Sequence, residues 1–212
     1  MKTETTIFYD VDTQRDFLAS GGALYLTDAE QIVPRLKEIT DFARETKVRV
    51  VCALDLHSPG DPRLKSWGGQ LPDHCIVGTP GAEKIDATRP LNPMIVGAHE
   101  LSHEEIQAAL DHKGELLFDR QKFEALADNA HAHSIMRLVL RPFSDIVMYG
   151  VYLDVCVERA LRALIGLGPK LHILSDAIAI VNQHAADSFD AWRADGIDLV
   201  TMEALKTAML NQ

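Results

Sequence analysis

The sequence of 212 residues lacks long apolar runs and has fewer basic than acidic residues. No segment reaches the roughly 18 apolar residues that a membrane-spanning helix needs. The N-terminus, MKTETTIFYDVDTQRDF, has no uninterrupted apolar stretch after its lysine, so we expect no signal peptide. With 21 Lys and Arg against 31 Asp and Glu, the net charge of −10 disfavours nucleic acid and anionic membranes as partners, because both attract basic surfaces.

Cysteine is also scarce, which excludes a disulfide framework. Cys52, Cys75 and Cys156 make an odd number with no close pair, a usage typical of reduced thiols, and we expect a cytoplasmic protein. The length and the 47% hydrophobic content are those of an ordinary globular protein with a full core. We therefore expect a single domain over residues 1–212.

Apolar segments of strand length alternate with segments of helical period. The expected strands are rich in β-branched or aromatic residues, and they cover residues 5–11, 48–54, 93–98, 115–119, 145–151 and 170–175. The expected helices begin near Pro34 and at the capping-box pattern Ser102/Glu105, and they cover residues 131–141, 155–168 and 184–196. This alternation predicts an α/β fold, a three-layer doubly wound, mainly parallel sheet of six strands with helices on both faces.

Polar side chains follow four of the expected strands, at the edge of the sheet where such folds bind ligands. They are Asp10, Asp12 and Asp16 at the end of the first strand, Asp55 and His57 at the end of the second, Lys122 shortly after the fourth, and Cys156 after the fifth. An acid, an acid–imidazole pair, a cation and a thiol at one sheet edge predict a catalytic site. The Pro- and Gly-rich segment 56–92 has little periodicity, and connections of this length are usually functional or disordered.

The position of Cys156 allows two interpretations, a catalytic nucleophile and a core residue. In the first turn of a helix, free backbone N–H groups favour a thiolate and could bind an oxyanion, although the adjacent Asp154 works against that charge unless it caps the helix. Free cysteine is also among the most buried residue types, so Cys156 could equally be a small core residue.

A metal site is the second candidate. Asp55 and His57, at i and i+2, point the same way on an extended backbone, and His74 offers another imidazole. One carboxylate and two imidazoles suit zinc, while iron and manganese fit as well. Polar strand ends are common, so this spacing alone leaves the metal open.

Five motifs in order resemble the nicotinamidase/isochorismatase-like cysteine hydrolase superfamily. They span residues 7–181 and comprise VDTQRDF (11–17), DLHSPGDP (55–62), LPDHCIVGTPGAE (71–83), QKFEAL (121–126) and GVYLDVCVERA (150–160). The resemblance is to the nicotinamidase-like branch, and it implies the same six-stranded fold.

The resemblance also implies roles. It implies a triad of Asp12, Lys122 and Cys156, and a cis peptide bond between Val151 and Tyr152. The implied oxyanion donors are the backbone N–H groups of Tyr152 and Cys156, and the implied metal ligands are Asp55, His57 and His74. We expect the substrate pocket to lie between the metal and Phe17, Leu56, Leu71 and Tyr152.

Several positions depart from the family pattern. Leu56 and Leu71 stand where nicotinamidases usually have aromatic residues, which changes the shape of the pocket and weakens ring stacking. Asp10 replaces an apolar strand residue, and a buried carboxylate needs a partner that the sequence does not name.

The expected function is a metal-containing cysteine amidohydrolase that converts a small, nicotinamide-like carboxamide to its acid and ammonia through a thioester. The alternatives are a hydrolase of the same fold acting on another small amide, carbamoyl or ureido substrate, and a non-catalytic metal- or small-molecule-binding protein. Relatives are often dimers or tetramers, so we expect a homo-oligomer.

Overall fold

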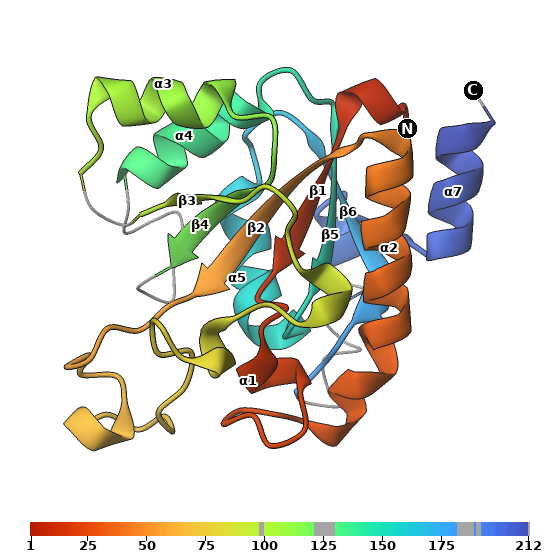
Figure 1. The fold of residues 1–212 in the computed structure, drawn as a ribbon. Helices are drawn as coiled ribbons and strands as arrows, with labels where there is room; N and C mark the ends of the chain where they lie inside the picture. The colour runs from red at the N-terminus through yellow and green to blue at the C-terminus, as the bar shows by residue number, and fades with distance from the viewer. Residues whose placement is uncertain (98–99, 121–129, 182–188, 190–191, 212) are drawn as a thin grey trace.

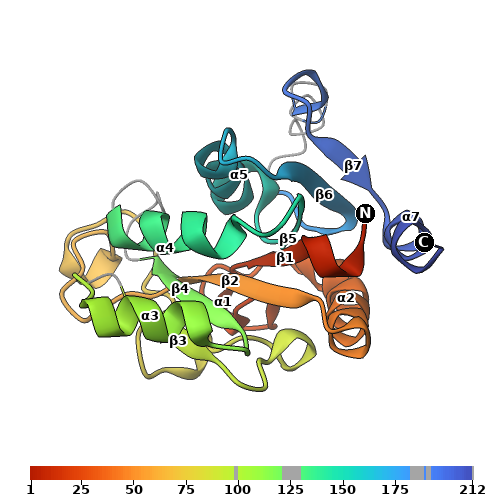
Figure 2. The ribbon, with the colours of Figure 1, turned by 90° about the horizontal axis from the view of Figure 1, so that it is seen from above.

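A parallel sheet of seven strands forms the centre of the protein, in the order β3-β4-β2-β1-β5-β6-β7 (Figure 1; β7 is labelled in Figure 2). The structure is a computed structural model that describes residues 1–97, 100–120, 130–181, 189 and 192–211. All six strand pairings are parallel. The strands are β1 (Thr6–Val11), β2 (Arg49–Asp55), β3 (Met94–Val96), β4 (Leu116–Arg120), β5 (Asp145–Gly150), β6 (Lys170–Ile178) and β7 (Asp198–Val200).

The predicted α/β class and the six predicted strands are confirmed, but the strand count of six is wrong. The seventh strand, β7, has only three residues and pairs with β6 at one end of the sheet. All three of its residues are half-buried, so no apolar run or alternation distinguishes it from a loop.

Helices cover both faces of the sheet (Figure 2). Alternate residues of β1 show the two layers, because Ile7 and Tyr9 belong to one core cluster and Phe8 to the other. The first cluster includes residues of α3 (His103–Asp111), α4 (Ala130–Leu140) and α5 (Glu158–Leu164). The second includes residues of α1 (Arg15–Leu18), α2 (Val33–Thr46) and α7 (Met202–Leu210). The predicted three-layer architecture is confirmed.

Local sequence signals explain where several helices begin. The Ser102 side chain accepts a hydrogen bond from the Glu105 amide and the Glu105 side chain returns one, the capping box expected at α3. Pro34 lies in the first turn of α2, as expected. The α7 helix was not predicted, although Thr201 caps it. Most of the helix expected at 184–196 lies outside the described residues.

The long segment 56–92 remains largely irregular and contains three short 3₁₀ turns, Lys65–Trp67, Pro80–Ala82 and Asp86–Thr88. It begins where β2 ends, so it contributes side chains to the carboxyl-terminal edge of the sheet. None of the described helices is long and apolar enough to cross a membrane.

Candidate active site

The carboxyl-terminal ends of β1 and β5 bring two predicted residues to one edge of the sheet. Val11 pairs with Gly150, and the Val151 amide donates to the Val11 carbonyl at 2.9 Å. Asp12 follows Val11, is fully buried and has a φ of 51°. The Val151–Tyr152 peptide bond is cis, as the resemblance implies. Asp12 and the segment that leads to Cys156 therefore both leave from the same pair of adjacent strands.

Gly150 permits this close approach. Its φ is 121°, and a Cβ atom built on it would lie 2.1 Å from the Val11 carbonyl oxygen. Any side chain at this position would separate the ends of β1 and β5 or force the backbone into a strained conformation.

Asp55, His57 and His74 form a compact buried group. One ligand atom from each lies within 4.8 Å of the others. The His57 Nε2 is 3.3 Å from Asp55 Oδ1, and the His74 Nε2 is 3.1 Å from Asp55 Oδ2. The i, i+2 spacing places Asp55 and His57 on one side of the chain, and the following loop adds His74. These three side chains therefore form a candidate site for a divalent metal ion.

Hydrogen bonds from the Nδ1 atoms orient both imidazoles toward Asp55. The His57 Nδ1 lies 2.8 Å from Asp61 Oδ2, so Nδ1–H donates to that carboxylate, and the buried Nε2 has no hydrogen-bond partner among the described residues. The His74 Nδ1–H donates to the Pro72 carbonyl at 2.7 Å. Each arrangement directs an Nε2 atom at Asp55, as is usual for metal-binding histidines.

Arg63 completes the outer contact to His57. Its guanidinium donates to both oxygens of Asp61, with the shortest distance 2.6 Å from Nη2 to Oδ2. Hydrogen bonds from Arg63, the largest cause, hold the pKa of Asp61 below its ordinary value. Asp61 is therefore an anion fixed in place beside His57.

Gln14 positions Asp55 through the backbone. Its side-chain amide accepts from the Asp55 amide and donates to the Asp55 carbonyl, each at 2.8 Å, and it also donates to the Ala82 carbonyl at 2.9 Å. The fully buried Gln14 side chain thus pairs with β2 as a neighbouring strand would and fixes the end of that strand.

Asp16 links the start of the chain to the loop that carries His74. Its Oδ2 accepts from the Cys75 amide at 2.6 Å, which supports Cys75 at a φ of 47°. A Cβ atom on Gly81 would lie 2.2 Å from this carboxylate. The glycine in GTPGAE therefore leaves room for Asp16.

Cys156 lies in a π-helical turn, Leu153–Val157, that precedes α5. The turn is fixed at its start, because the Leu153 amide donates to the Ala179 carbonyl at 2.8 Å. Asp154 Oδ1 accepts from the Val181 amide at 3.0 Å, so this carboxylate oxygen is bound to the neighbouring loop. Cys156 is 8% exposed and thus neither solvated nor fully enclosed.

A cavity of about 240 Å³ connects the Cys156 thiol with the candidate metal ligands Asp55 and His74. Cys156, Asp55 and His74 all contribute to its wall. The other lining residues are mostly apolar: Phe17, Leu24, Leu26, Leu71, Tyr152, Val155 and Val181. A nucleophile candidate and two metal-ligand candidates thus face one small, apolar space.

Tyr152 forms an aromatic wall with Phe17. The two ring centroids are 5.9 Å apart and the rings are nearly perpendicular, while Phe17 also contacts the His74 ring edge-on at 6.0 Å. The Tyr152 hydroxyl donates to the carbonyls of Phe17 and Leu24. Burial raises the pKa of Tyr152 to about 12, so the side chain shapes the cavity as a neutral group.

Asp10 has a partner that the sequence did not name. Its Oδ1 lies 2.8 Å from the Nζ of Lys84, and both side chains are almost completely buried. The Thr13 hydroxyl donates to Asp10 at 2.8 Å and accepts from Lys84 at 2.6 Å. Burial opposes the charge on Lys84, but Asp10 outweighs it, so the pKa of Lys84 is raised. This buried ion pair joins β1 to the loop that follows GTPGAE.

The structure thus places most of the predicted site residues, while Lys122 lies outside the described residues. Leu56 is absent from the residues that line the cavity and packs instead against the core clusters. Sequence reasoning missed Gln14, Asp61 and Lys84, which contact Asp55, His57 and Asp10 respectively. Gln14 and Asp61 lie within the quoted motifs, which is the one signal that could have identified them.

Comparison with known proteins adds family membership. Residues 7–204 match the isochorismatase domain family, which covers nearly the whole chain. The chain belongs to the isochorismatase family. Within it, the chain is 26% identical to the nicotinamidase of Escherichia coli (strain K12), over 91% of this chain and 92% of that protein.

Solved structures share the isochorismatase fold. The pyrazinamidase of Pyrococcus horikoshii, solved in complex with zinc, superposes with a TM-score of 0.70 at 22% identity and covers 93% of this chain and 99% of its own. The N-carbamoylsarcosine amidase of Thermoplasma acidophilum gives 0.67 at 21% identity and covers 95% and 96%. This isochorismatase-family chain is of the nicotinamidase-like type, a hydrolase that acts on carbon–nitrogen bonds other than peptide bonds.

The hydrogen bond between His57 and Asp61 leads to a prediction about metal affinity. Asp61→Asn should weaken zinc binding about 10- to 100-fold, because the His57 ring loses the carboxylate that fixes its tautomer. Competition with a chromogenic chelator measures this affinity. The control is Asp73→Asn, which changes a carboxylate on the same loop that bonds the Ser66 amide and not an imidazole. Equal zinc affinities in the two variants would show that the contact to His57 has no effect.

Proposed function

We propose that the protein is a metal-containing cysteine amidohydrolase that hydrolyses a small, nicotinamide-like carboxamide to its acid and ammonia. The observation that carries the proposal is the single cavity of about 240 Å³ that Cys156, Asp55 and His74 line together. Nucleophilic attack and recognition of one polar group of the substrate require such groups to face the same space.

The proposed chemistry begins with the thiol of Cys156. Asp12 accepts the thiol proton, and the thiolate attacks the amide carbon, so a C–S bond forms and the carbonyl oxygen becomes an oxyanion. The backbone N–H groups of Tyr152 and Cys156 stabilise this oxyanion, and Lys122 pairs with the charges of Asp12 and Cys156. Asp12 then donates the proton to the nitrogen, the C–N bond breaks and ammonia leaves a thioester.

Hydrolysis of the thioester completes the cycle. Asp12 accepts a proton from water as the water oxygen attacks the thioester carbon, and the C–S bond breaks. The sulfur recovers a proton from Asp12, and the acid leaves. The overall reaction consumes one water for each amide and releases one ammonia.

The buried polar group fits a divalent metal ion. Among the described residues, the His57 Nε2 has no hydrogen-bond partner. This atom, the His74 Nε2 and the Asp55 carboxylate are the donors that zinc prefers, and iron and manganese accept the same set. A bound ion would supply Lewis-acid character at the cavity wall. Asp55, His57 and His74 would hold that ion, with Asp61 orienting the first imidazole.

The size and lining of the cavity favour a small, ring-bearing amide. Its volume lies below the 300 to 1,000 Å³ that is usual for drug-sized ligands, so a single ring with one carboxamide suits it. The perpendicular rings of Phe17 and Tyr152 provide an aromatic wall, and Leu71 offers an aliphatic surface. We also propose a reducing, cytoplasmic location, because Cys52, Cys75 and Cys156 are all free thiols.

Ammonia release from defined substrates tests this function. We expect the zinc-loaded protein to release ammonia from nicotinamide with a kcat/KM of at least about 10⁴ M⁻¹s⁻¹, the lower end of ordinary enzymes. N-Carbamoylsarcosine should be a poorer substrate, because it lacks a ring to pack against Phe17 and Tyr152. A glutamate dehydrogenase-coupled assay measures both reactions.

Two outcomes would contradict the proposal in different ways. Faster hydrolysis of N-carbamoylsarcosine than of nicotinamide would assign the protein to carbamoyl substrates and leave the cysteine mechanism intact. No ammonia release from any small amide or carbamoyl compound would favour a non-catalytic binding protein on the same scaffold.

A further inference from the structure

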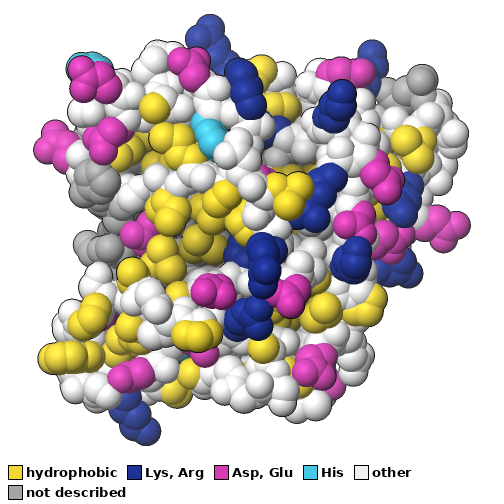
Figure 3. Space-filling view, viewed as in Figure 1, with side chains coloured by type: hydrophobic (Ala, Val, Ile, Leu, Met, Phe, Trp, Pro, Cys, Tyr) yellow, Lys and Arg dark blue, Asp and Glu magenta, His cyan; other side chains and the backbone are white. Residues whose placement is uncertain are grey.

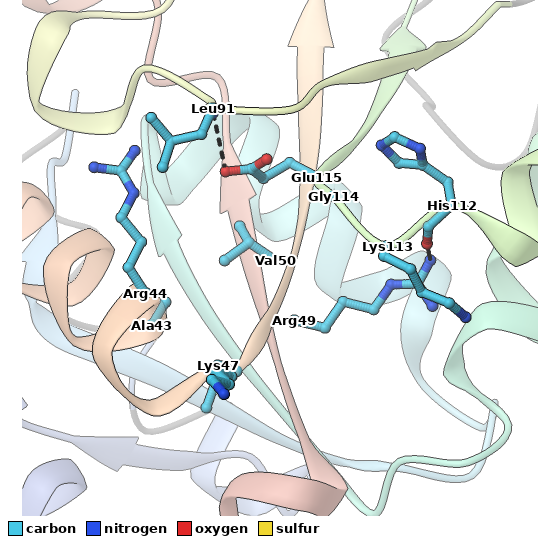
Figure 4. A pocket seen from close by; sticks show the side chains of 11 residues that line it. Ala43, Arg44, Lys47, Arg49, Val50, Leu91, His112, Lys113, Gly114 and Glu115 are labelled. Carbon is cyan, nitrogen blue, oxygen red and sulfur yellow. Dashed lines mark hydrogen bonds between the residues drawn. The ribbon is translucent and has the colours of Figure 1, made fainter.

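A second cavity lies at the amino-terminal edge of the sheet, opposite the candidate active site (Figure 4). Its volume is about 440 Å³, and its walls come from the last turn of α2, the start of β2, Leu91 and residues 112–115. Because β2 runs seven residues from Arg49 to Asp55, about 20 Å of strand separates this cavity from the candidate metal ligand Asp55. The two cavities share no lining residue.

The charge of this second cavity is opposite to that of the protein. The chain has a net charge of −10, yet four cations and one carboxylate line the cavity. The cations are Arg44, Lys47, Arg49 and Lys113, and the carboxylate is Glu115. Figure 3 shows Lys and Arg side chains gathered beside α2 on this face. Such a concentration of like charge attracts anions.

Arg49 is the most confined of these cations. Its Nη2 donates to the His112 carbonyl at 3.2 Å, and its buried Nε has no hydrogen-bond partner among the described residues. Burial lowers the pKa of Arg49, and within the described part of the chain no carboxylate pairs with it. An arginine that is partly removed from water without a counter-charge is stabilised when an anion binds next to it.

The nearby acidic groups neutralise only part of the positive charge, because Glu115 is one carboxylate against four lining cations. Glu115 accepts hydrogen bonds from the amides of Leu91 and Asn92 at 3.3 and 3.2 Å, so its carboxylate is used to fix the cavity wall. Asp41 reaches Arg44 only at 4.0 Å. Lys47, at a φ of 58°, ends α2 and offsets the partial negative charge of its carbonyl end. The two arginines and Lys113 therefore keep an excess of positive charge.

The remaining lining residues provide an apolar surface. Ala43, Val48, Val50 and Leu91 contribute it, and Leu91 is 73% exposed. In Figure 4, Arg44 and Arg49 lie on opposite sides of Val50, with Leu91 and Glu115 on a third side. A ligand that covers Val50 and Leu91 thus has a guanidinium on either side.

We propose that this cavity binds a ring-bearing phosphate monoester, of the class of nucleoside monophosphates. The ring packs against Val50 and Leu91, and the phosphate binds Arg44 on one side of Val50, because a planar guanidinium matches phosphate oxygens. Arg49, on the other side of Val50, donates to an acceptor atom of the ring or sugar. The volume lies within the range of small-molecule sites. This site is independent of the proposed hydrolase activity.

Isothermal titration of the full-length protein with AMP tests the site. We expect saturable 1:1 binding, with adenosine and inorganic phosphate each binding at least about tenfold more weakly, since each lacks half of the recognised chemistry. The double variant Arg44→Gln/Lys47→Gln should weaken AMP binding at least about tenfold, because it removes one phosphate contact and adjacent positive charge.

The matched control removes two positive charges elsewhere. Lys65→Gln/Lys170→Gln changes an exposed loop lysine and the first residue of β6, and AMP binding should stay within about twofold of the parent. Equal melting temperatures of the two double variants establish that both are folded. No saturable binding at millimolar AMP, equal affinity in the Arg44/Lys47 variant, or phosphate binding as tightly as AMP would each overturn the assignment.

Discussion

Replacing Cys156 with alanine should lower kcat/KM for ammonia release from nicotinamide by at least about 10⁴-fold. Among the described residues that line the cavity with Asp55 and His74, Cys156 supplies the only sulfur, and the variant loses it while the aromatic wall stays in place. Because thioester formation becomes impossible, kcat should fall, and the substrate KM should change little. Initial rates over a range of nicotinamide concentrations separate the two parameters.

The control for this variant is Cys52→Ala. Cys52 is almost completely buried within β2, and burial raises the pKa of its thiol to about 12, so it is a core residue without a thiolate at neutral pH. Its replacement should leave kcat/KM within about threefold, since the lost packing affects stability and not the cavity. Ammonia release that persists unchanged in Cys156→Ala would eliminate the proposed nucleophile.

Replacing Lys84 with methionine should lower the free energy of unfolding by about 3 to 5 kcal/mol. The substitution leaves Asp10 as a buried carboxylate whose remaining described partner is the Thr13 hydroxyl. The raised pKa of Lys84 means that the ammonium stabilises the folded state below the pKa of an unfolded lysine and ceases to do so only when the pH rises through the folded value. The whole decrease in the free energy of unfolding should therefore be observed at neutral pH. Urea unfolding measures it.

Two further variants make this prediction specific. Lys170→Met disrupts an exposed ion pair with Asp198 of similar length, 2.7 Å, and should lower the free energy of unfolding much less than Lys84→Met does, because solvent screens the pair. The double variant Asp10→Val/Lys84→Met removes both buried charges and should be more stable than Lys84→Met alone, because no unpaired carboxylate remains. A cost in Lys84→Met no larger than in Lys170→Met would show that the buried pair contributes little.

The sheet and most of its helices were predictable, because their signals are local. Buried parallel strands such as 145–151 have apolar residues on both faces, and a capping box such as Ser102/Glu105 determines a helix start within four residues. β7 escaped prediction because three half-buried residues carry no period. Helix α7 has its cap at Thr201, and its buried Met202, Leu205 and Met209 are spaced for one face, so its signal was present in the sequence.

The site was predictable only to the extent that strand ends determine it. Asp55 and His57 lie together because an extended backbone directs i and i+2 to one side. The pairing of Asp10 with Lys84, and that of Gln14 with the Ala82 carbonyl, depends on how the irregular segment 56–92 returns to β1. No periodic pattern encodes that path. The cavity volume, and the exclusion of Leu56 from its wall, depend on the same path.

The central claim is that Cys156 is an activated thiol that faces the substrate cavity, and the rate of alkylation at each cysteine tests it most directly. Brief treatment with iodoacetamide at neutral pH, followed by peptide mass spectrometry, should modify Cys156 at least about 100-fold faster than Cys52 and Cys75, and nicotinate should protect it. Alkylation of Cys156 no faster than that of the fully buried Cys75, with or without nicotinate, would contradict the account.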